Sequence, residues 1–281
     1  MNCLRFLHIP KTAGSTFTGC LAYQYFGKRH FSFTGHSPAD INRFMSLSAS
    51  KMQKIELFTG HAPILTGIEM ADNAKIITFL REPVSRVKSF IQHIAEGKSP
   101  EYLTGPFDLD QFLESGIADL SNLQTQMLIN NGAPISRSLM DTISKPEARD
   151  RALNNLFNGV SEFGIQEYFD ESLVLFARSL NWSIPYYISV NKKNTKRLVE
   201  FKQQHLDRIA ELNSIDTELY VAAKAKFLSI IERANFDNTA LNKLKQNNSS
   251  ATPHNSILNI RHTLFRLRRR IWNFYEVAPS S

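Results

Sequence analysis

The chain has 281 residues, of which 42% are hydrophobic and 21% charged, enough for one sizeable α/β domain with a full core. No run of about 18 apolar residues is present, so no membrane-spanning helix is expected. The two cysteines form no CxxC pattern, which fits a reducing compartment and indicates no metal site. The net charge of +7 raises the alternative of a non-enzymatic polyanion binder, but no nucleic-acid-binding signature accompanies it.

The first predicted element is an apolar strand that runs into a polar turn and a helix, within Phe6–Phe17 (FLHIPKTAGSTF). Pro10 ends the strand because it lacks an N–H and favours an extended residue before it. Gly14 has no side chain and lets the backbone approach a ligand closely. The amides of residues 13–16 are expected to point out of the first helical turn, where the helix dipole favours an anion. The pattern predicts a site for a phosphate-like anion.

Three side chains of this turn favour the same anion. Lys11 supplies a full positive charge, while Ser15 and Thr16 can cap the helix or donate hydrogen bonds to the anion. The P-loop of nucleotide kinases, G-x-x-x-x-G-K-[ST], places its Lys after the last glycine, whereas Lys11 precedes the only glycine here. A P-loop-type phosphotransferase is therefore a poor literal match, and a turn that merely caps a helix is the other alternative.

A second strand-turn-helix pattern follows at residues 75–94 (KIITFLREPVSRVKSFIQHI). The strand covers Ile76–Leu80, and the helix is expected to start near Pro83, a favoured first helical residue. Arg81 lies where the strand ends, and Ser89 lies about a turn and a half into the helix. The planar fork of an Arg and the hydroxyl of a Ser in these positions can hold one phosphate between them.

Together the two segments resemble the 5′-phosphosulfate loop and the 3′-phosphate motif of sulfotransferases that use 3′-phosphoadenosine 5′-phosphosulfate (PAPS). The match is closest to the carbohydrate branch, which includes the heparan sulfate 2-O- and 6-O-sulfotransferases and their bacterial relatives. The resemblance covers about residues 4–236 and continues, in the family's order, in Leu120–Asn130, Phe163–Trp182 and Leu212–Phe227. One departure is Gln126, where many relatives carry Arg, so any ligand contact of that Arg is in doubt in this chain.

The resemblance implies in-line transfer of a sulfuryl group from PAPS to a hydroxyl or amine of a glycan or glycolipid, leaving 3′-phosphoadenosine 5′-phosphate (PAP), without a metal. It also implies a P-loop-like three-layer α/β fold with a central parallel sheet. Lys11 and the loop amides would stabilise the charge on the departing phosphate. Arg81 and Ser89 would bind the 3′-phosphate. The cofactor-binding residues of the loop are then Lys11, Thr12, Ala13, Gly14, Ser15 and Thr16.

The acceptor must lose a proton, which calls for a general base near the loop. We predict His61, because it follows an apolar run that reads as a strand and lies in a Gly-His context similar to that of the family's histidine bases. His36 is the main rival. His8, expected inside the first strand, and His93, on the helix after Ser89, are interpreted as structural, and Glu82 as support for a helix dipole.

Strand and helix signals alternate up to about residue 94, as a parallel sheet wound by helices requires. Helices dominate afterwards, and the later predicted elements are helices at Asp108–Gly116, Asn122–Asn130, 146–158 and Phe169–Leu180, and strands at Phe163–Ile165 and Tyr186–Val190. The basic loop 191–197 either closes over an anionic ligand or is a solvated run of charge.

Three regions are predicted: a sulfotransferase domain (1–245), a polar linker (246–256) and a basic amphipathic C-terminal helix (257–281). The stretch 257–277 carries five Arg and one Glu, and Arg261 and Arg268 interrupt its apolar stripe. This favours either a helix docked on an anionic membrane surface, with snorkelling Arg side chains, or a helix folded back on the domain or a partner.

The N-terminus begins almost at the first strand, so no signal peptide or anchor is expected. Animal glycan sulfotransferases of this type are Golgi proteins with an N-terminal membrane helix. A cytoplasmic and bacterial enzyme is therefore expected. Any contact with the inner face of the membrane is expected to be made by the C-terminal helix. No nucleic-acid partner is expected.

Overall fold

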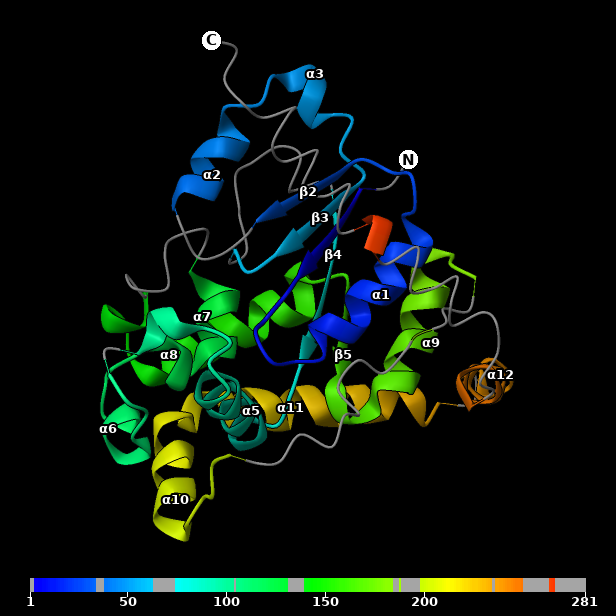
Figure 1. Cartoon of the computed structure of the whole chain (residues 1–281). Helices are drawn as coiled ribbons and strands as arrows, with labels where there is room; N and C mark the ends of the chain where they lie inside the picture. The colour runs from blue at the N-terminus through cyan, green and yellow to red at the C-terminus, as the bar shows by residue number, and fades with distance from the viewer. Residues whose placement is uncertain are drawn as a thin grey trace.

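The chain folds around a five-stranded parallel sheet flanked by helices (Figure 1), which confirms the expected α/β class with a central parallel sheet. The computed structural model describes residues 3–33, 38–62, 74–103, 105–130, 139–183, 187, 198–233, 236–249 and 263–265. The strands, in chain order, are β1 Leu4–Leu7, β2 His30–Phe33, β3 Leu57–Gly60, β4 Lys75–Leu80 and β5 Glu162–Ile165. Their spatial order is β2-β3-β1-β4-β5.

The central position of β1 decides where a site can form. β1 pairs with β3 through Leu4 opposite Leu57, and with β4 through Leu4 opposite Lys75. All three strands are parallel, so their carboxyl ends meet at one edge of the sheet. Buried parallel strands read as apolar runs, as β1 (LRFL) and β4 (KIITFL) do.

Helices cover both faces of the sheet. Figure 1 shows α1 and α9 on one side and α5, α7 and α8 on the other, with α11 crossing below them. The helices are α1 Gly14–Gln24, α2 Pro38–Met45, α3 Ala49–Met52, α5 Pro83–Ala95, α6 Leu109–Leu113, α7 Leu123–Ile129, α8 Lys145–Asn154, α9 Phe169–Leu180, α10 Gln203–Leu212, α11 Ser214–Ile231 and α12 Asn238–Ser249. Short helical turns lie at Pro100–Tyr102, Ala118–Leu120, Leu139–Asp141, Asn155–Gly159 and Gln166–Tyr168.

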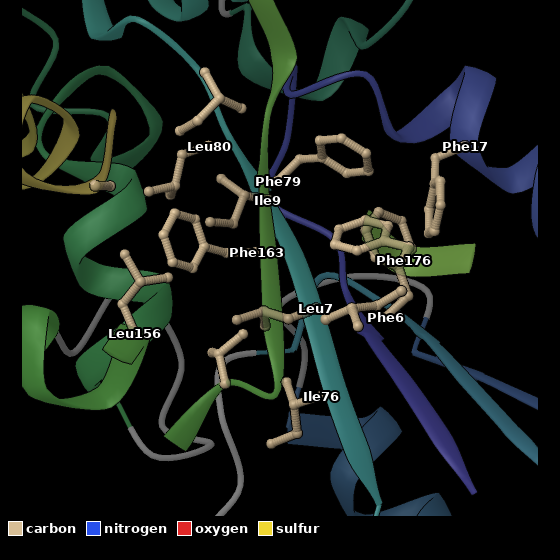
Figure 2. Close-up of a cluster of buried hydrophobic side chains, with 14 of the residues drawn as sticks. Phe6, Leu7, Ile9, Phe17, Ile76, Phe79, Leu80, Leu156, Phe163 and Phe176 are labelled. Atoms are coloured by element: carbon tan, nitrogen blue, oxygen red, sulfur yellow. The ribbon is translucent and has the colours of Figure 1, made fainter. Parts of the chain in front are cut away.

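Aromatic side chains hold α1 and α9 on the sheet. Phe17 of α1 packs edge-on against Phe6 and Phe79, with ring centroids 4.7 and 5.1 Å apart. Phe176 of α9 lies 5.6 Å from the Phe17 ring, and Figure 2 shows the four rings together on one side of the strands. Edge-to-face packing of this kind adds to the free energy of burial. The start of α1 is therefore held against the ends of β1 and β4.

The amino ends of α7 and α11 cap each other. Asn122 Oδ1 accepts hydrogen bonds from the amides of Ile215 and Asp216, both at 3.0 Å. In return the Asp216 carboxylate accepts from the amides of Gln124 (3.0 Å) and Thr125 (2.7 Å). Helix amino ends carry unpaired amides, and each end here supplies the cap of the other. The two predicted motifs in this region are thereby joined in one brace.

Several predicted elements agree with the structure, and others differ from it. The helices predicted at Asn122–Asn130 and Phe169–Leu180 are present as α7 and α9, and β5 contains the strand predicted at 163–165. The expectation that His8 lies inside the first strand is wrong, because β1 ends at Leu7. Helix α12 continues to Ser249 and includes residues 246–249, the start of the predicted linker.

Three predictions lie largely or wholly outside the described residues: the strand at 186–190, the basic loop 191–197 and the linker beyond 249. Of the predicted C-terminal helix, residues 263–265 are described and are helical. Phe265 is 5% exposed, and its ring stacks on His30 of β2 at 4.8 Å. Leu264, which belongs to the apolar stripe, is 46% exposed. No helix among the described residues is long and apolar enough to cross a membrane.

Candidate active site

Three of the predicted site residues come together at the carboxyl edge of the sheet. Lys11 follows β1, His61 follows β3, and Arg81 follows β4. Because β3 and β4 flank β1, the three segments are neighbours in space. Ligands of open α/β sheets bind at this edge.

The turn after β1 is held in an unusual backbone conformation. Lys11 and Ala13 both have positive φ, 68° and 70°, a region that non-glycine residues adopt at a cost of about 1–3 kcal/mol. Ala13 is the N-cap of α1, and the first backbone hydrogen bond of this helix runs from Phe17 N to Ala13 O at 3.0 Å. The amides of residues 14–16 precede that bond and have no acceptor within the helix, which suits an anion.

The side chains of this turn differ from expectation in two respects. Ala13 is the N-cap and forms no side-chain cap, whereas Ser15 and Thr16 lie within the first turn, so of the two roles predicted for their hydroxyls the capping role is not observed. Thr12 is fully buried, and its hydroxyl donates to Ile9 O at 2.8 Å. The Thr12 side chain therefore stabilises the turn, and only its backbone is left for a ligand. Ser15 is exposed at the amino end of α1.

Lys11 is a weaker cation than its residue type suggests. The pKa of Lys11 is lowered to about 8, chiefly by burial and to a smaller extent by the positive charges of Lys98 and Arg81. Lys98 itself is paired with Glu96. An anion bound at the turn would offset both causes of the lowered pKa. The turn is thus an electropositive site, and a bound anion would stabilise the charged form of Lys11.

Arg81 is fixed by a double hydrogen bond to its backbone. Gln124 Oε1 accepts from Arg81 N at 2.9 Å, and Gln124 Nε2 donates to Arg81 O at 2.9 Å. The guanidinium donates from Nη1 to Lys11 O at 3.1 Å, whereas Nε is buried without a hydrogen-bond partner among the described residues. An unpaired buried donor costs free energy that a ligand oxygen would recover.

A cavity of about 740 Å³ opens beside Arg81. One wall is a face of α5 that carries Ser85, Lys88, Ser89 and Gln92, and the opposite wall is the segment 198–201. Its volume is in the range of pockets that hold small-molecule ligands. Arg81 and Ser89, predicted to share one phosphate, both line it.

A hydrogen bond to the backbone fixes the tautomer of His61. Its Nδ1 lies 2.8 Å from His8 O, and because a carbonyl oxygen only accepts, Nδ1 carries the proton of the neutral ring. The other nitrogen, Nε2, then holds the lone pair. The rings of His61 and His8 pack with centroids 4.3 Å apart, and His8 stacks on Phe6 at 5.2 Å.

Gly14 has a packing role that was not predicted, while the predicted close approach of a ligand stays a prediction. A Cβ at this position would lie 1.7 Å from His8 Nε2, so the missing side chain makes room for the His8 imidazole. The contact ties the amino end of α1 to His8, and through His8 to His61. His8 therefore belongs to the site, as a residue that packs against the candidate base.

The remaining candidates are placed as follows. Glu82 is the N-cap of α5 and accepts from the amides of Val84 (2.9 Å) and Ser85 (2.7 Å), which confirms its predicted helix-supporting role. Gln126 is 4% exposed, and its amide donates to Ser121 O at 2.5 Å, so its side chain is directed at backbone rather than at a ligand. His36 lies outside the described residues.

Four residues of this region were missed from the sequence. Ser85, Lys88 and Gln92 could have been found: Ser85 and Gln92 lie four residues before and three after Ser89, and Lys88 lies three after Ser85, spacings that share a helix face. Gln124 lies in Leu120–Asn130, a segment identified only by its resemblance to the sulfotransferases. Nothing local marked the segment 198–201 as a wall of the cavity, because it lies far from α5 in the sequence.

The comparisons with known proteins assign no family. No protein-family model matches this chain, and no curated protein matches its sequence.

Proposed function

We propose that this protein is a sulfotransferase that moves a sulfuryl group from PAPS to a hydroxyl or amine of a glycan or glycolipid. The observation that supports it most is the hydrogen bond from Arg81 to Lys11 O, which joins an anion-binding turn to a cavity lined by Arg81 and Ser89. PAPS carries phosphate at both ends of its ribose, and two adjoining anion sites of this kind suit such a nucleotide. The P-loop-like character of the fold is part of this proposal.

The residues present fit the two phosphates of PAPS. The amides of residues 14–16 and Lys11 would bind the 5′-phosphosulfate, and the unpaired Nε of Arg81 with the Ser89 hydroxyl would bind the 3′-phosphate. PAPS would supply the sulfuryl group. No metal ligand is required, since the charges on the nucleotide are met by protein cations and amides.

Each residue then has a defined part in the reaction. His61 Nε2 takes the proton of the acceptor hydroxyl or amine while the bond from the acceptor atom to sulfur forms. The bond between sulfur and the bridging oxygen breaks, and the electron pair goes to the phosphate of PAP. Lys11 and the amides at the start of α1 stabilise that developing charge. His8 keeps the His61 ring in place.

The test is turnover of PAPS against a panel of glycans, read as PAP release and as sulfated product. We expect product formation by the wild type that is unaffected by EDTA, little product with Lys11→Met, and normal product with Lys54→Met, an exposed control. Magnesium-dependent consumption of ATP with no use of PAPS would instead support the phosphotransferase alternative. Binding of polyanions that persists in Lys11→Met and Arg81→Ala, without turnover, would support a non-enzymatic role.

We further propose that the enzyme is cytoplasmic and bacterial, and that its C-terminal segment meets an anionic membrane surface. Support comes from the excess of Arg in 257–277 and from Leu264, which is exposed while its neighbour Phe265 is buried on the domain. Flotation with vesicles containing about 30% anionic lipid tests this, using the full chain and a variant with Arg268, Arg269 and Arg270 changed to Glu. Equal flotation of the two proteins would contradict membrane contact.

A further inference from the structure

A second cationic side chain, that of Lys88, lines the cavity beside Arg81, and no role was predicted for it from the sequence. Lys88 lies one turn along α5 from Ser85 and lines the same cavity as Arg81. Its ammonium is 5.3 Å from the centre of the Phe201 ring on the opposite wall. Among the described residues no acidic side chain pairs with Lys88. The half-buried side chain of Lys88 therefore has an aromatic ring as its partner, where many lysines have a carboxylate.

The charges around this cavity are uneven. Arg81 and Lys88 are both positive, and Glu200 is the one acid among the described residues of its walls. Glu200 is exposed and forms no ion pair among the described residues. A dianion bound in a cavity that is lined by two cations is attracted to both of them. The cavity is therefore suited to more than one negative charge.

Phe201 is held in place from both directions along the chain. On one side, Val199 N donates to Gln92 Oε1 of α5 at 3.3 Å. On the other side, Lys202 N donates to His205 Nδ1 at 3.0 Å at the start of α10. The ring that faces Lys88 is thus part of a segment fixed to α5 and to α10.

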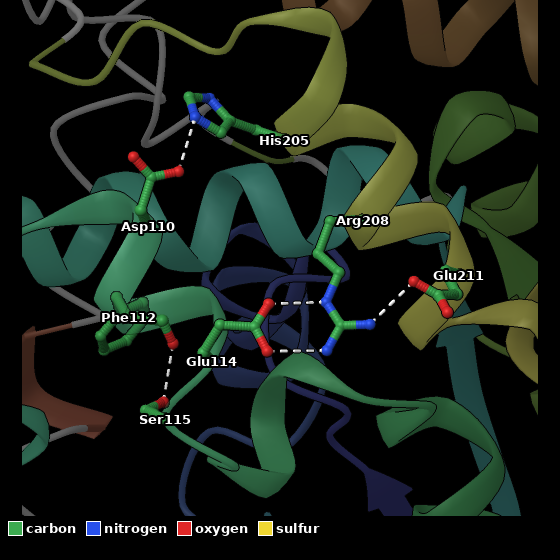
Figure 3. Close-up of polar contacts among 7 residues, drawn as sticks. All are labelled: Asp110, Phe112, Glu114, Ser115, His205, Arg208 and Glu211. Atoms are coloured by element: carbon green, nitrogen blue, oxygen red, sulfur yellow. Dashed lines mark hydrogen bonds and ion pairs between the residues drawn. The ribbon is translucent and has the colours of Figure 1, made fainter.

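Helix α10 is in turn anchored to α6, as Figure 3 shows. Arg208 donates from Nε and Nη2 to the two carboxylate oxygens of Glu114, both at 2.8 Å. His205 Nε2 lies 3.1 Å from Asp110 Oδ1, and because Nδ1 accepts from Lys202, Nε2 is the donor. A paired guanidinium–carboxylate contact is directional as well as attractive. The far wall of the cavity is consequently a preorganised surface.

We propose that Lys88, whose ammonium packs over the Phe201 ring, is a second cationic ligand of the nucleotide 3′-phosphate. In this role it sets the preference for 3′-phosphorylated nucleotides. This inference rests on the proposed function and adds a residue to its binding site. A phosphomonoester carries about −1.5 to −2 charges at pH 7, so Arg81 alone matches only part of it. Lys88 supplies the remaining charge, and Ser85 and Ser89 on the same face of α5 offer hydroxyl groups.

The test measures dissociation constants by calorimetry for two probes, adenosine 3′,5′-bisphosphate and adenosine 5′-phosphate. The proteins are the wild type, Lys88→Met, Lys88→Arg, and Lys243→Met as an exposed control. Met keeps the alkyl stem over Phe201 but removes the charge. We expect Lys88→Met to bind the bisphosphate about tenfold more weakly, with binding of the monophosphate within about twofold of wild type. Lys88→Arg and Lys243→Met should retain the wild-type preference.

The outcomes separate this inference from the proposed function. If the wild type does not prefer the bisphosphate, the proposed function fails and the inference with it. If the wild type prefers the bisphosphate and Lys88→Met does so equally, Lys88 is no phosphate ligand and only the inference fails. Equal weakening of both probes in Lys88→Met would also overturn it, because that result indicates a general change of the cavity.

Discussion

Arg81 donates a hydrogen bond from Nη1 to the backbone oxygen of Lys11 at 3.1 Å, which couples the two motifs that we propose bind the anionic groups of a nucleotide. The contact spans two neighbouring strand ends, and Lys11 has the positive φ of 68° that presents its carbonyl there. Arg81 is therefore both a candidate phosphate ligand and a support of the turn that would bind the other end of the nucleotide.

This double role distinguishes Arg81 from Ser89. Arg81→Lys removes the forked side chain and its bond to Lys11, so binding of both adenosine 3′,5′-bisphosphate and adenosine 5′-phosphate should weaken, by about tenfold or more. Ser89→Ala should weaken only the bisphosphate, by about fivefold, the value of one hydrogen bond. Calorimetric titration of the two variants measures this, and an unchanged monophosphate affinity in Arg81→Lys would contradict the supporting role.

Gly14 is expected to be intolerant of any side chain because of His8. A Cβ would lie 1.7 Å from His8 Nε2, so Gly14→Ala should lower the free energy of unfolding by about 1–3 kcal/mol. Gly19→Ala is the matched control in the same helix, since a Cβ there meets nothing within 4 Å and Ala favours the helix.

Urea titrations of these variants include a double mutant as a further check. His8→Ala should relieve the clash, so the Gly14→Ala penalty should shrink when it is measured in the His8→Ala background. An equal penalty in both backgrounds would show that Gly14 is required for a reason other than His8.

His61 should carry its proton on Nδ1. In the neutral ring this atom donates to His8 O at 2.8 Å, which leaves Nε2 unprotonated. Nitrogen-15 NMR of histidine-labelled protein reports the tautomer directly, and a proton on Nε2 would be incompatible with the base that we propose. His61→Asn should lower kcat by about 10²–10⁴-fold without a change in PAP affinity.

Nucleotide binding should take up a proton at the turn. Burial lowers the pKa of Lys11 from 10.5 to about 8, and a bound 5′-phosphate favours the charged form and raises that pKa. Above about pH 8 part of the Lys11 population is neutral in the free protein and must gain a proton on binding. Calorimetry at about pH 8.5 in buffers of different ionisation enthalpy should show this uptake in the wild type and none in Lys11→Met.

The same lowered pKa has a consequence for stability. Because the folded protein binds the Lys11 proton less tightly than the unfolded chain, the charged side chain opposes folding below about pH 8. That opposition decreases as the pH rises from about 8 towards 10.5, so the contribution of Lys11 to the free energy of unfolding increases over that range.

Substitutions of Asn122 should weaken the brace between α7 and α11 and lower the free energy of unfolding. This residue has a φ of 45° and accepts two backbone amides of α11. Asn122→Gly keeps the left-handed conformation and loses only the cap, at about 1 kcal/mol, whereas Asn122→Ala adds backbone strain and should cost about 2 kcal/mol or more. Equal unfolding free energies of the two variants would show that the conformation contributes nothing.

Local patterns in the sequence were sufficient for the elements that position this site. Pro83 indicated the start of α5, and the strand that ends before Arg81 is present as β4. Turn and helix signals of this kind depend on neighbouring residues, so they can be predicted without knowledge of tertiary contacts.

The parts that could not be predicted depend on how the folded turn and the helices place their side chains, which the local pattern does not give. Thr12 was predicted to be a cofactor-binding residue, and only the fold shows that its hydroxyl donates to Ile9 O. Similarly, Gly14 faces His8 across the turn, and Phe201 reaches Lys88 through the packing of α10 on α5 and α6. Periodicity and spacing carry no information about such side-chain contacts.

Selective stabilisation by PAP is the measurement that tests the central claim most directly. Thermal unfolding of the wild type, Arg81→Ala and the exposed control Arg233→Ala would be followed with PAP alone and with ATP plus magnesium. At a PAP concentration about 100 times its dissociation constant, the wild type and the control should gain about 2.7 kcal/mol, and Arg81→Ala far less. No shift with PAP, or an equal shift with ATP and magnesium, would contradict a PAPS-dependent sulfotransferase.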